Sequence, residues 1–275
     1  MHYLSIAAMV RFYRPNEAEQ WYKYHLAIGV DHFYLVDDSS EFNLCEVFDE
    51  KHVTFLDINQ SNERVNLQGR LLVELPVLLK DKTHWVALID SDEFLFSTND
   101  CFKNFLNAFE DKSCVELKLK QFRSDGWKHY DSNSIIPLRY TRYQDSYTIK
   151  SIANLIKCPL PFPNINIHRP FKDGVDALGN VPTKGKIGHR HYPPDSFQQP
   201  AWINHYPIRD LEQVEAKFHQ GSFDFWQKNE IGMIYLLRQV WGAMPTELDM
   251  RFAMRKYHPK VTKEFLSSLS FAKKA

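Results

Sequence analysis

Short apolar runs alternate with helix-compatible stretches along the first third of the chain. The runs of strand length are residues 3–10, 31–36, 53–57 and 85–89. Between them, residues 16–28 carry a helical pattern that Gly29 ends, and residues 62–82 repeat leucine at helical spacing. Strands that alternate with helices predict crossover connections. We therefore expect an α/β fold with a mostly parallel central sheet flanked by helices.

The pattern changes in the second half of the chain. Residues 115–122 alternate apolar and polar side chains, which predicts a half-exposed strand. Residues 158–200 are rich in Pro, Gly and His, which predicts loops with a few short strands. Helical patterns return at 210–218 and 225–243. We expect one domain over residues 1–245 and a basic helical appendage over 246–275.

Composition excludes several classes of protein. The 275 residues hold 34 basic and 34 acidic side chains, so a binder of nucleic acid, which needs a basic excess, is not expected. The four cysteines form no C-x-x-C pair, which argues against a zinc ribbon or a disulfide scaffold. No apolar run reaches the length of about 20 residues that spans a membrane, and the first run lacks a basic leader. These features favour a cytoplasmic protein.

Acidic pairs follow two of the predicted strands. Asp90-Ser91-Asp92 comes directly after the apolar run 85–89, and Asp37-Asp38 follows the run 31–36. Ligands bind at the carboxyl ends of strands in such sheets. Carboxylate oxygens suit Mg²⁺ or Mn²⁺, which would neutralise a diphosphate leaving group. Asp37-Asp38 also fits a β-turn or a helix cap, so that reading stays open for this pair.

Imidazoles and cations supply further candidate ligands. His205 would complete a manganese shell begun by Asp90 and Asp92, and a structural or exposed histidine is the alternative. A zinc site built from His168, His189 and His191 is the less favoured alternative. Lys184, Lys186 and Arg190 would hold a diphosphate or a charged acceptor, and a solvated loop is the alternative. The chain has no G-x-S-x-G, G-x-x-x-x-G-K-[ST] or G-x-G-x-x-G segment, which argues against an α/β-hydrolase, a phosphate loop and a dinucleotide fingerprint.

Several segments together resemble one family of enzymes. Residues 19–34 resemble the EW-x-x-YH-x-x-x-GVDHFY stretch of glycosyltransferase family 92 and of related family-2-like bacterial transferases. Residues 85–95 are similar to their W-V-x-x-x-D-x-DEF-L segment, residues 122–126 to FGSSG, and residues 203–206 to INHY. Lys217 and Gly221 fit the basic residue and the glycine that follow. The matches run in order over about residues 5–225.

This resemblance implies a GT-A fold, with a nucleotide-sugar half over about residues 1–112 and an acceptor half over about 113–245. It implies inverting transfer of a hexose from a UDP-sugar with Mn²⁺ or Mg²⁺. The metal ligands are then expected to be Asp90, Asp92 and His205. The donor-binding residues are expected to be Arg11, Asp37, Asp38, Gln68, Asp90, Ser91 and Lys184.

The sequence departs from the family pattern at two places. After the first strand the family usually has Lys-Asn-Glu, whereas this chain has Arg11-Phe12-Tyr13-Arg14. Arg11 or Arg14 would then contact the nucleobase of the donor. Asp125 stands where the family often has Ser. We predict Asp125 as the catalytic base, because it lies in a polar loop after a strand. A turn before Gly126 is the alternative role, and the rival bases are Asp173, Asp176 and Glu230.

We therefore expect a glycosyltransferase that extends a glycan or a lipid-linked glycan, in bacterial surface polysaccharide or lipooligosaccharide synthesis. A noncatalytic sugar- or nucleotide-binding protein on the same fold is the alternative, followed by a metal-dependent phosphohydrolase. Residues 251–275 hold seven Lys or Arg and one acid, Glu264, with apolar residues between them. Such a segment favours weak peripheral association with an anionic membrane, and a helix packed on the domain is the other reading.

Overall fold

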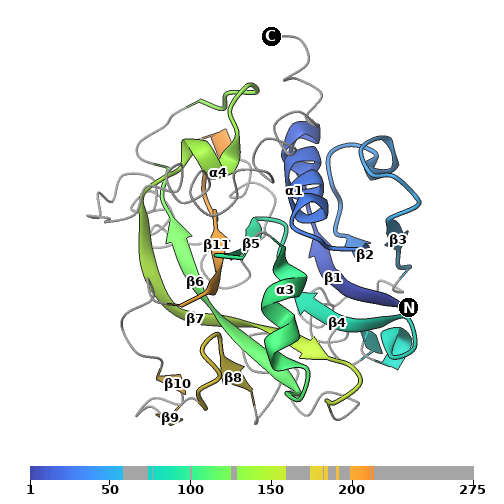
Figure 1. Cartoon of the computed structure of the whole chain (residues 1–275). Coiled ribbons are helices and arrows are strands. Elements are labelled where there is room, and N and C mark those ends of the chain that lie inside the picture. Colours follow the sequence, from blue (N-terminus) through green and yellow to red (C-terminus); the bar gives the residue numbers. More distant parts are fainter. Residues whose placement is uncertain are drawn as a thin grey trace.

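A mixed, curled sheet of nine strands organises the protein (Figure 1). The computed structural model describes residues 1–57, 74–75, 77–99, 101–124, 129–158, 174–181, 183–184, 190–191, 199–210 and 212–213. The strands of this sheet are β1 (His2–Val10), β2 (His32–Asp37), β3 (Val53–Phe55), β4 (Thr83–Leu88), β5 (Glu93–Ser97), β6 (Cys114–Phe122), β7 (Tyr143–Asn154), β8 (Val175–Asp176) and β11 (Ala201–His205). A separate ribbon pairs β9 (Thr183–Lys184) with β10 (Arg190–His191).

The described helices are short apart from α1 (Pro15–Ala27), which follows β1. The others are α3 (Phe102–Leu106) and α4 (Ile136–Arg139), with 3-10 turns η1 (Leu44–Glu46) and η2 (Asn107–Phe109). Gly29 ends α1 as the sequence predicts: its φ is +103°, and a Cβ there would lie 2.6 Å from the Cys101 sulfur. Only the last part of the helix predicted over 62–82 is described, and residues 74–75 and 77–79 are helical.

Strand order shows where the predicted topology holds and where it does not. The order is β3-β2-β1-β4-β7-β6-β11-β5, with β8 added on β6. The first four strands are parallel, as expected. Beyond them, β7 is antiparallel to both β4 and β6, and β5 is antiparallel to β11. The sheet is therefore mixed rather than mostly parallel. The described residues of the connection from β6 to β7 contain the short α4, and β7 returns antiparallel beside β6 (Figure 1).

The prediction that residues 115–122 form a half-exposed strand is wrong in its exposure. Strand β6 is there, but its polar residues Glu116, Lys118 and Lys120 are buried. Strand β6 lies between β7 and β11, and aromatic side chains of these two neighbours cover one of the lysines. The Lys120 ammonium lies 4.5 Å from the ring centroid of Tyr143 and 4.4 Å from that of Trp202. Aromatic faces thus stabilise a cation that sequence alternation assigned to solvent.

One face of α1 is bonded to the backbone of β5. The indole of Trp21 donates to the Glu93 carbonyl at 2.9 Å, and the Tyr24 hydroxyl donates to the Leu95 carbonyl at 2.7 Å. The Leu95 amide donates to Nε2 of His25 at 3.2 Å. These bonds fix the start of β5, which directly follows the acidic turn at residues 90–92. The W-x-x-Y-H spacing thus has a structural role, since it connects α1 to that turn.

Candidate functional site

The acidic turn between β4 and β5 carries three carboxylates. Asp90 and Asp92 belong to the turn, and Glu93 begins β5. The turn is closed in both directions, since the Asp90 amide donates to Oε2 of Glu93 at 2.9 Å and the Glu93 amide donates to the Asp90 carbonyl at 3.1 Å. Glu93 is 1% exposed, whereas the Asp90 side chain is 38% exposed. The turn therefore presents Asp90 outward and keeps Glu93 inside.

A buried lysine on β7 faces this turn. Nζ of Lys150 lies 2.6 Å from Oδ2 of Asp90 and 3.3 Å from Oε2 of Glu93, and its side chain is 1% exposed. Burial lowers the pKa of Lys150, but the charges of Asp90 and Glu93 outweigh burial and raise it. Burial raises the pKa of Glu93, the Lys150 ammonium opposes that rise, and Asp90 adds to it. The lysine is therefore held in its charged form.

His205 lies on the other side of the acidic turn. Strand β11 pairs with β5 so that His205 is opposite Glu93, and the Tyr206 amide donates to the Asp92 carbonyl at 2.8 Å. Nε2 of His205 lies 3.5 Å from Oδ1 of Asp92. Burial lowers the pKa of His205, but Asp92, then Glu93 and Asp90, outweigh burial and the net direction is upward. The structure thus brings together two of the three predicted metal ligands.

The first loop after β1 lies beside the acidic turn. The hydroxyl of Ser91 donates to the Arg11 carbonyl at 3.3 Å. Arg11 pairs with Asp38, with Nη2 3.0 Å from Oδ2, and its Nε also donates to the Asp38 carbonyl. This contact follows from the parallel pairing of β1 and β2, in which Val10 is opposite Asp37. Four of the predicted donor-binding residues are therefore at one edge of the sheet: Arg11, Asp38, Asp90 and Ser91.

Asp37 and Asp38 differ in their surroundings. Oδ1 of Asp37 accepts the Ser40 amide at 2.9 Å, which is the turn-forming role that the sequence left open. Ser39, between Asp38 and Ser40, has a φ of 64°, a left-handed conformation that is rare for a residue with a side chain. Asp38 points instead to Arg11. Asp38, rather than Asp37, therefore contacts Arg11, whose carbonyl accepts the Ser91 hydroxyl of the acidic turn.

The donor atoms of this edge suit a divalent cation. Two ligands of one cation lie roughly 3 Å apart, because metal–ligand bonds are about 2.1 Å long. The Asp92 and His205 donor atoms, at 3.5 Å, are close to that separation. Within the described part of the chain, no three His, Cys, Asp or Glu side chains gather as a ready metal cage. Such a cation would then take its remaining ligands from water and from the oxygens of a bound diphosphate.

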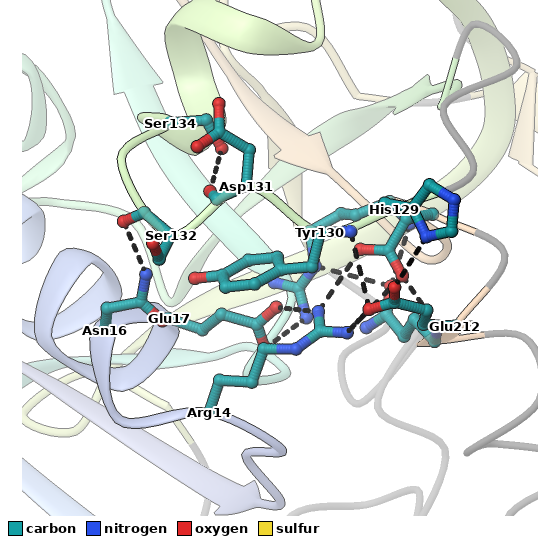
Figure 2. Close-up of polar contacts among 12 residues, drawn as sticks. Arg14, Asn16, Glu17, His129, Tyr130, Asp131, Ser132, Ser134 and Glu212 are labelled. Atoms are coloured by element: carbon teal, nitrogen blue, oxygen red, sulfur yellow. Dashed lines mark hydrogen bonds and ion pairs between the residues drawn. The ribbon is translucent and has the colours of Figure 1, made fainter.

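Arg14, the alternative contact to the nucleobase, has another role in the structure. Nη1 of Arg14 lies 3.1 Å from Glu17 and 3.2 Å from Asp210, and Nη2 lies 3.2 Å from Glu212. Its guanidinium also lies 3.9 Å from the ring centroid of Tyr130 (Figure 2). Glu17 and Asp210 are buried. Arg14 thus joins the start of α1 to residues that follow β11, which supports the strand that carries His205.

Some predicted residues lie beyond what the structure describes. They are Gln68, Asp125, His168, Asp173, Lys186, His189 and Glu230, and the side chains of Lys184, Arg190 and His191. Asp176 is described and is buried, and its Oδ1 accepts the amides of Leu178 and Asn180, both at 2.9 Å. Its strand β8 pairs with the beginning of β6, away from His205. Asp176 therefore shapes its own turn, which argues against a role as the catalytic base.

Sequence reasoning missed two residues of this site. Glu93 adjoins the acidic pair, and its burial was not predicted because charged side chains are rarely buried. Lys150 lies in the strand segment Ile149-Lys150-Ser151-Ile152, which gives no local sign of a partner sixty residues away. A buried lysine in a strand signals a paired carboxylate, but it does not say which one.

Comparison with known proteins shows a distant similarity. A glycosyltransferase family 92 protein of Ricinus communis is 22% identical over 242 residues, which cover 83% of this chain and 40% of that protein. The chain thus spans less than half the length of this relative. No protein-family profile matches the chain. Among solved structures, the bifunctional IspDF from Campylobacter jejuni is 10% identical over 59% of this chain and 45% of its own, with a TM-score of 0.30, a likeness from which nothing follows.

Proposed function

We propose that this protein is a metal-dependent glycosyltransferase that moves a hexose from a UDP-sugar to a glycan acceptor with inversion, on a sheet of GT-A type. The observation that carries the proposal is the meeting of Asp92 and His205 beside the Arg11–Asp38 pair at one edge of the sheet. The distant similarity to a family 92 glycosyltransferase supports the same class of reaction. The proposal includes an acceptor in bacterial surface polysaccharide or lipooligosaccharide synthesis.

The donor residues divide into two groups in this proposal. Arg11 and Asp38 contact the nucleoside, with Asp37 supporting their loop, because they lie at the ends of β1 and β2. Asp92 and His205 hold Mn²⁺ or Mg²⁺, and Asp90 and Ser91 complete the edge that faces the diphosphate. Gln68 and Lys184 remain predicted donor contacts. The bound cation supplies positive charge for the leaving diphosphate.

The transfer itself requires a base on the acceptor side. We propose Asp125, in the segment that follows β6, which takes the proton from the acceptor hydroxyl as that oxygen attacks the anomeric carbon. The UDP leaves from the opposite face, so a single displacement inverts the configuration. His205 ends β11, which lies between β5 and β6, so in this proposal it stands between the donor side and the acceptor half that β6 begins.

The test is a panel of nucleotide sugars. Thermal shift with each UDP-sugar and Mn²⁺ identifies the donor, since a ligand that binds the folded state raises the melting temperature. Hydrolysis and transfer are then measured with Mn²⁺ and with EDTA. UDP release that needs Mn²⁺ supports the proposal. Stabilisation without turnover on any acceptor would instead indicate a noncatalytic binding protein, and release of inorganic phosphate a phosphohydrolase.

A lipid-linked acceptor would place the enzyme at a membrane. Among the described residues, no helix combines the length and the apolar composition that a membrane crossing requires. We propose weak, salt-sensitive association through the basic residues 246–275, which lie outside the described residues, and a cytoplasmic location. Co-sedimentation with anionic liposomes, compared between the full chain and a chain ending at Pro259, tests this. Equal behaviour of the two at low salt contradicts it.

A further inference from the structure

Lys150 occupies the inner side of the acidic turn. Strand β7 is antiparallel to β4, with Ile152 opposite Ala87, so Lys150 lies level with the end of β4 where Asp90 follows. Its Nζ is 2.6 Å from Asp90 and 3.3 Å from Glu93. Lys150 and Glu93 are each 1% exposed. The ammonium group is therefore held between two carboxylates at a place that solvent does not reach.

The negative charges of the acidic turn indicate the role of the Lys150 ammonium group. Asp90, Asp92 and Glu93 bring three carboxylates within four residues. Clustered carboxylates of this kind bind two divalent cations in many phosphoryl-transfer enzymes. Here a fixed positive charge contacts Asp90 and Glu93, two of the three carboxylates that could bridge such cations. A second divalent cation at that place would be repelled by Lys150 at short range.

We propose that Lys150 is a fixed internal cation that takes the place of a second metal, so that the turn binds one divalent cation, between Asp92 and His205. Lys150 is thus a positioning residue: it holds Asp90 and Glu93 and leaves the Asp92–His205 pair for the metal. This inference rests on the proposed metal-dependent function. It also favours transfer with one cation on a diphosphate over two-metal hydrolysis.

Titration of the full-length protein with Mn²⁺ tests the inference without any activity assay. Calorimetry on the metal-free protein is expected to give one Mn²⁺ site for the wild type. Lys150→Met removes the charge and keeps much of the volume. It is expected to bind Mn²⁺ at least about tenfold more tightly, or to bind a second ion, because a nearby positive charge is lost and two carboxylates are released. Lys150→Arg keeps the charge and is expected to keep one site.

A matched control removes a lysine–carboxylate pair at the other end of the strands. Lys103 pairs with Asp31, whose side chain accepts the amides of Tyr3 and Leu4 at the beginning of β1. Lys103→Met is expected to leave the Mn²⁺ titration unchanged. If Lys150 had a purely structural role, Lys150→Met would also leave Mn²⁺ binding unchanged. It would only lower the melting temperature.

If Lys150→Met does not fold, Glu93→Gln decides the question. This variant leaves the Lys150 charge less neutralised, so Mn²⁺ binding is expected to weaken about tenfold although Glu93 is no ligand. Wild-type affinity and stoichiometry in a folded Lys150→Met protein, or in Glu93→Gln, overturns the inference. Two Mn²⁺ ions on the wild type overturn it while leaving the transferase proposal intact. A wild type that binds no Mn²⁺ overturns both the inference and the metal dependence of the proposed function.

Discussion

The imidazole of His205 and the carboxylate of Asp92 face each other at 3.5 Å, although they come from distant parts of the chain. Backbone pairing creates this relationship. His205 is opposite Glu93 across β11 and β5, and the Tyr206 amide donates to the Asp92 carbonyl. Because main-chain bonds hold the two residues together, either side chain can be replaced without separating the strands. The pair can therefore be tested by substitution.

Asp92→Ala is expected to lower kcat for UDP-sugar turnover by about a hundredfold or more, since cation support for a diphosphate is worth several kcal/mol in the transition state. The fold should persist, because it is the Asp92 carbonyl that bonds to Tyr206. Steady-state kinetics at limiting Mn²⁺ measures the loss, and circular dichroism checks the fold. Wild-type turnover under these conditions would show that Asp92 does not hold the metal.

His205→Ala is expected to act on metal dependence before it acts on anything else. Loss of a ligand, with Asp92 still present, should weaken Mn²⁺ binding by roughly 10–100-fold. Added Mn²⁺ should then restore much of the rate. The measurement is the activity as a function of Mn²⁺ concentration in the variant and the wild type. Identical metal curves for the two proteins would return His205 to a structural role.

Binding of Mn²⁺ should also depend on pH through His205. Its pKa lies above the ordinary 6.5 because Asp92, Glu93 and Asp90 outweigh the effect of burial. A ligating imidazole must be neutral, so protons compete with the metal. The apparent affinity for Mn²⁺ should rise up to about tenfold per pH unit below the raised pKa and level off above it. Calorimetry across this range tests the expectation, and His205→Ala should lack this His205-dependent part of the rise.

The raised pKa of His205 has the opposite effect on the stability of the metal-free protein, which should fall rather than rise with pH. The charged His205–Asp92 pair contributes stability that is fully present below the unfolded pKa of 6.5. That contribution is lost as pH rises through the raised folded pKa. Denaturant titrations without metal, in the wild type and in His205→Ala, separate this effect from metal binding. A wild-type stability that rose relative to the variant over this interval would contradict the assigned pairing.

The parts of the fold that the sequence predicts are those with local signals. Strands β1, β2 and β4 and helix α1 appear within a few residues of their predicted bounds, because their apolar period and the terminal Gly29 are local properties. The return of β7 beside β6 is not local. It depends on whether the connection crosses the sheet, and the pattern of residues within each strand is the same for either direction.

The site shows the same division. The position of Asp90 and Asp92 at the end of a buried strand follows from the sequence, since a strand exit is a local feature. That Asp38 rather than Asp37 meets Arg11 depends on the loop conformation around Ser39. The contact of Lys150 with Asp90 depends on the antiparallel neighbour β7. Neither relationship has a signature in the spacing of residues.

Asp38→Ala is expected to weaken the binding of free UDP and of the UDP-sugar to the same extent, because the contact is to the part that both ligands share. The loss should therefore appear in KM or Kd with kcat little changed. Calorimetry with UDP measures it. Since Asp38 is paired with Arg11, the double variant Arg11→Ala, Asp38→Ala should be less than additive. Equal UDP affinity in Asp38→Ala and the wild type would show that Asp37 and Asp38 form a turn and do not contact the nucleotide.

His25 is the buried residue that connects α1 to β5. Its Nδ1 donates to the Trp21 carbonyl at 2.8 Å and its Nε2 accepts the Leu95 amide, so the ring is neutral in the folded protein. Burial lowers the pKa of His25 to about 3, opposed by the bond to Trp21. The unfolded chain, with a pKa near 6.5, binds the proton first. His25 therefore destabilises the fold as pH falls from about 6.5 toward 3, by up to about 1.4 kcal/mol per pH unit.

Urea unfolding of the wild type and of His25→Gln at several pH values tests this. The variant should be less stable at neutral pH by about 1–3 kcal/mol, since Gln fits the two bonds imperfectly. The difference between the two proteins should then shrink as the pH falls. A difference that stays constant with pH would mean that His25 is not the buried neutral group that couples α1 to β5.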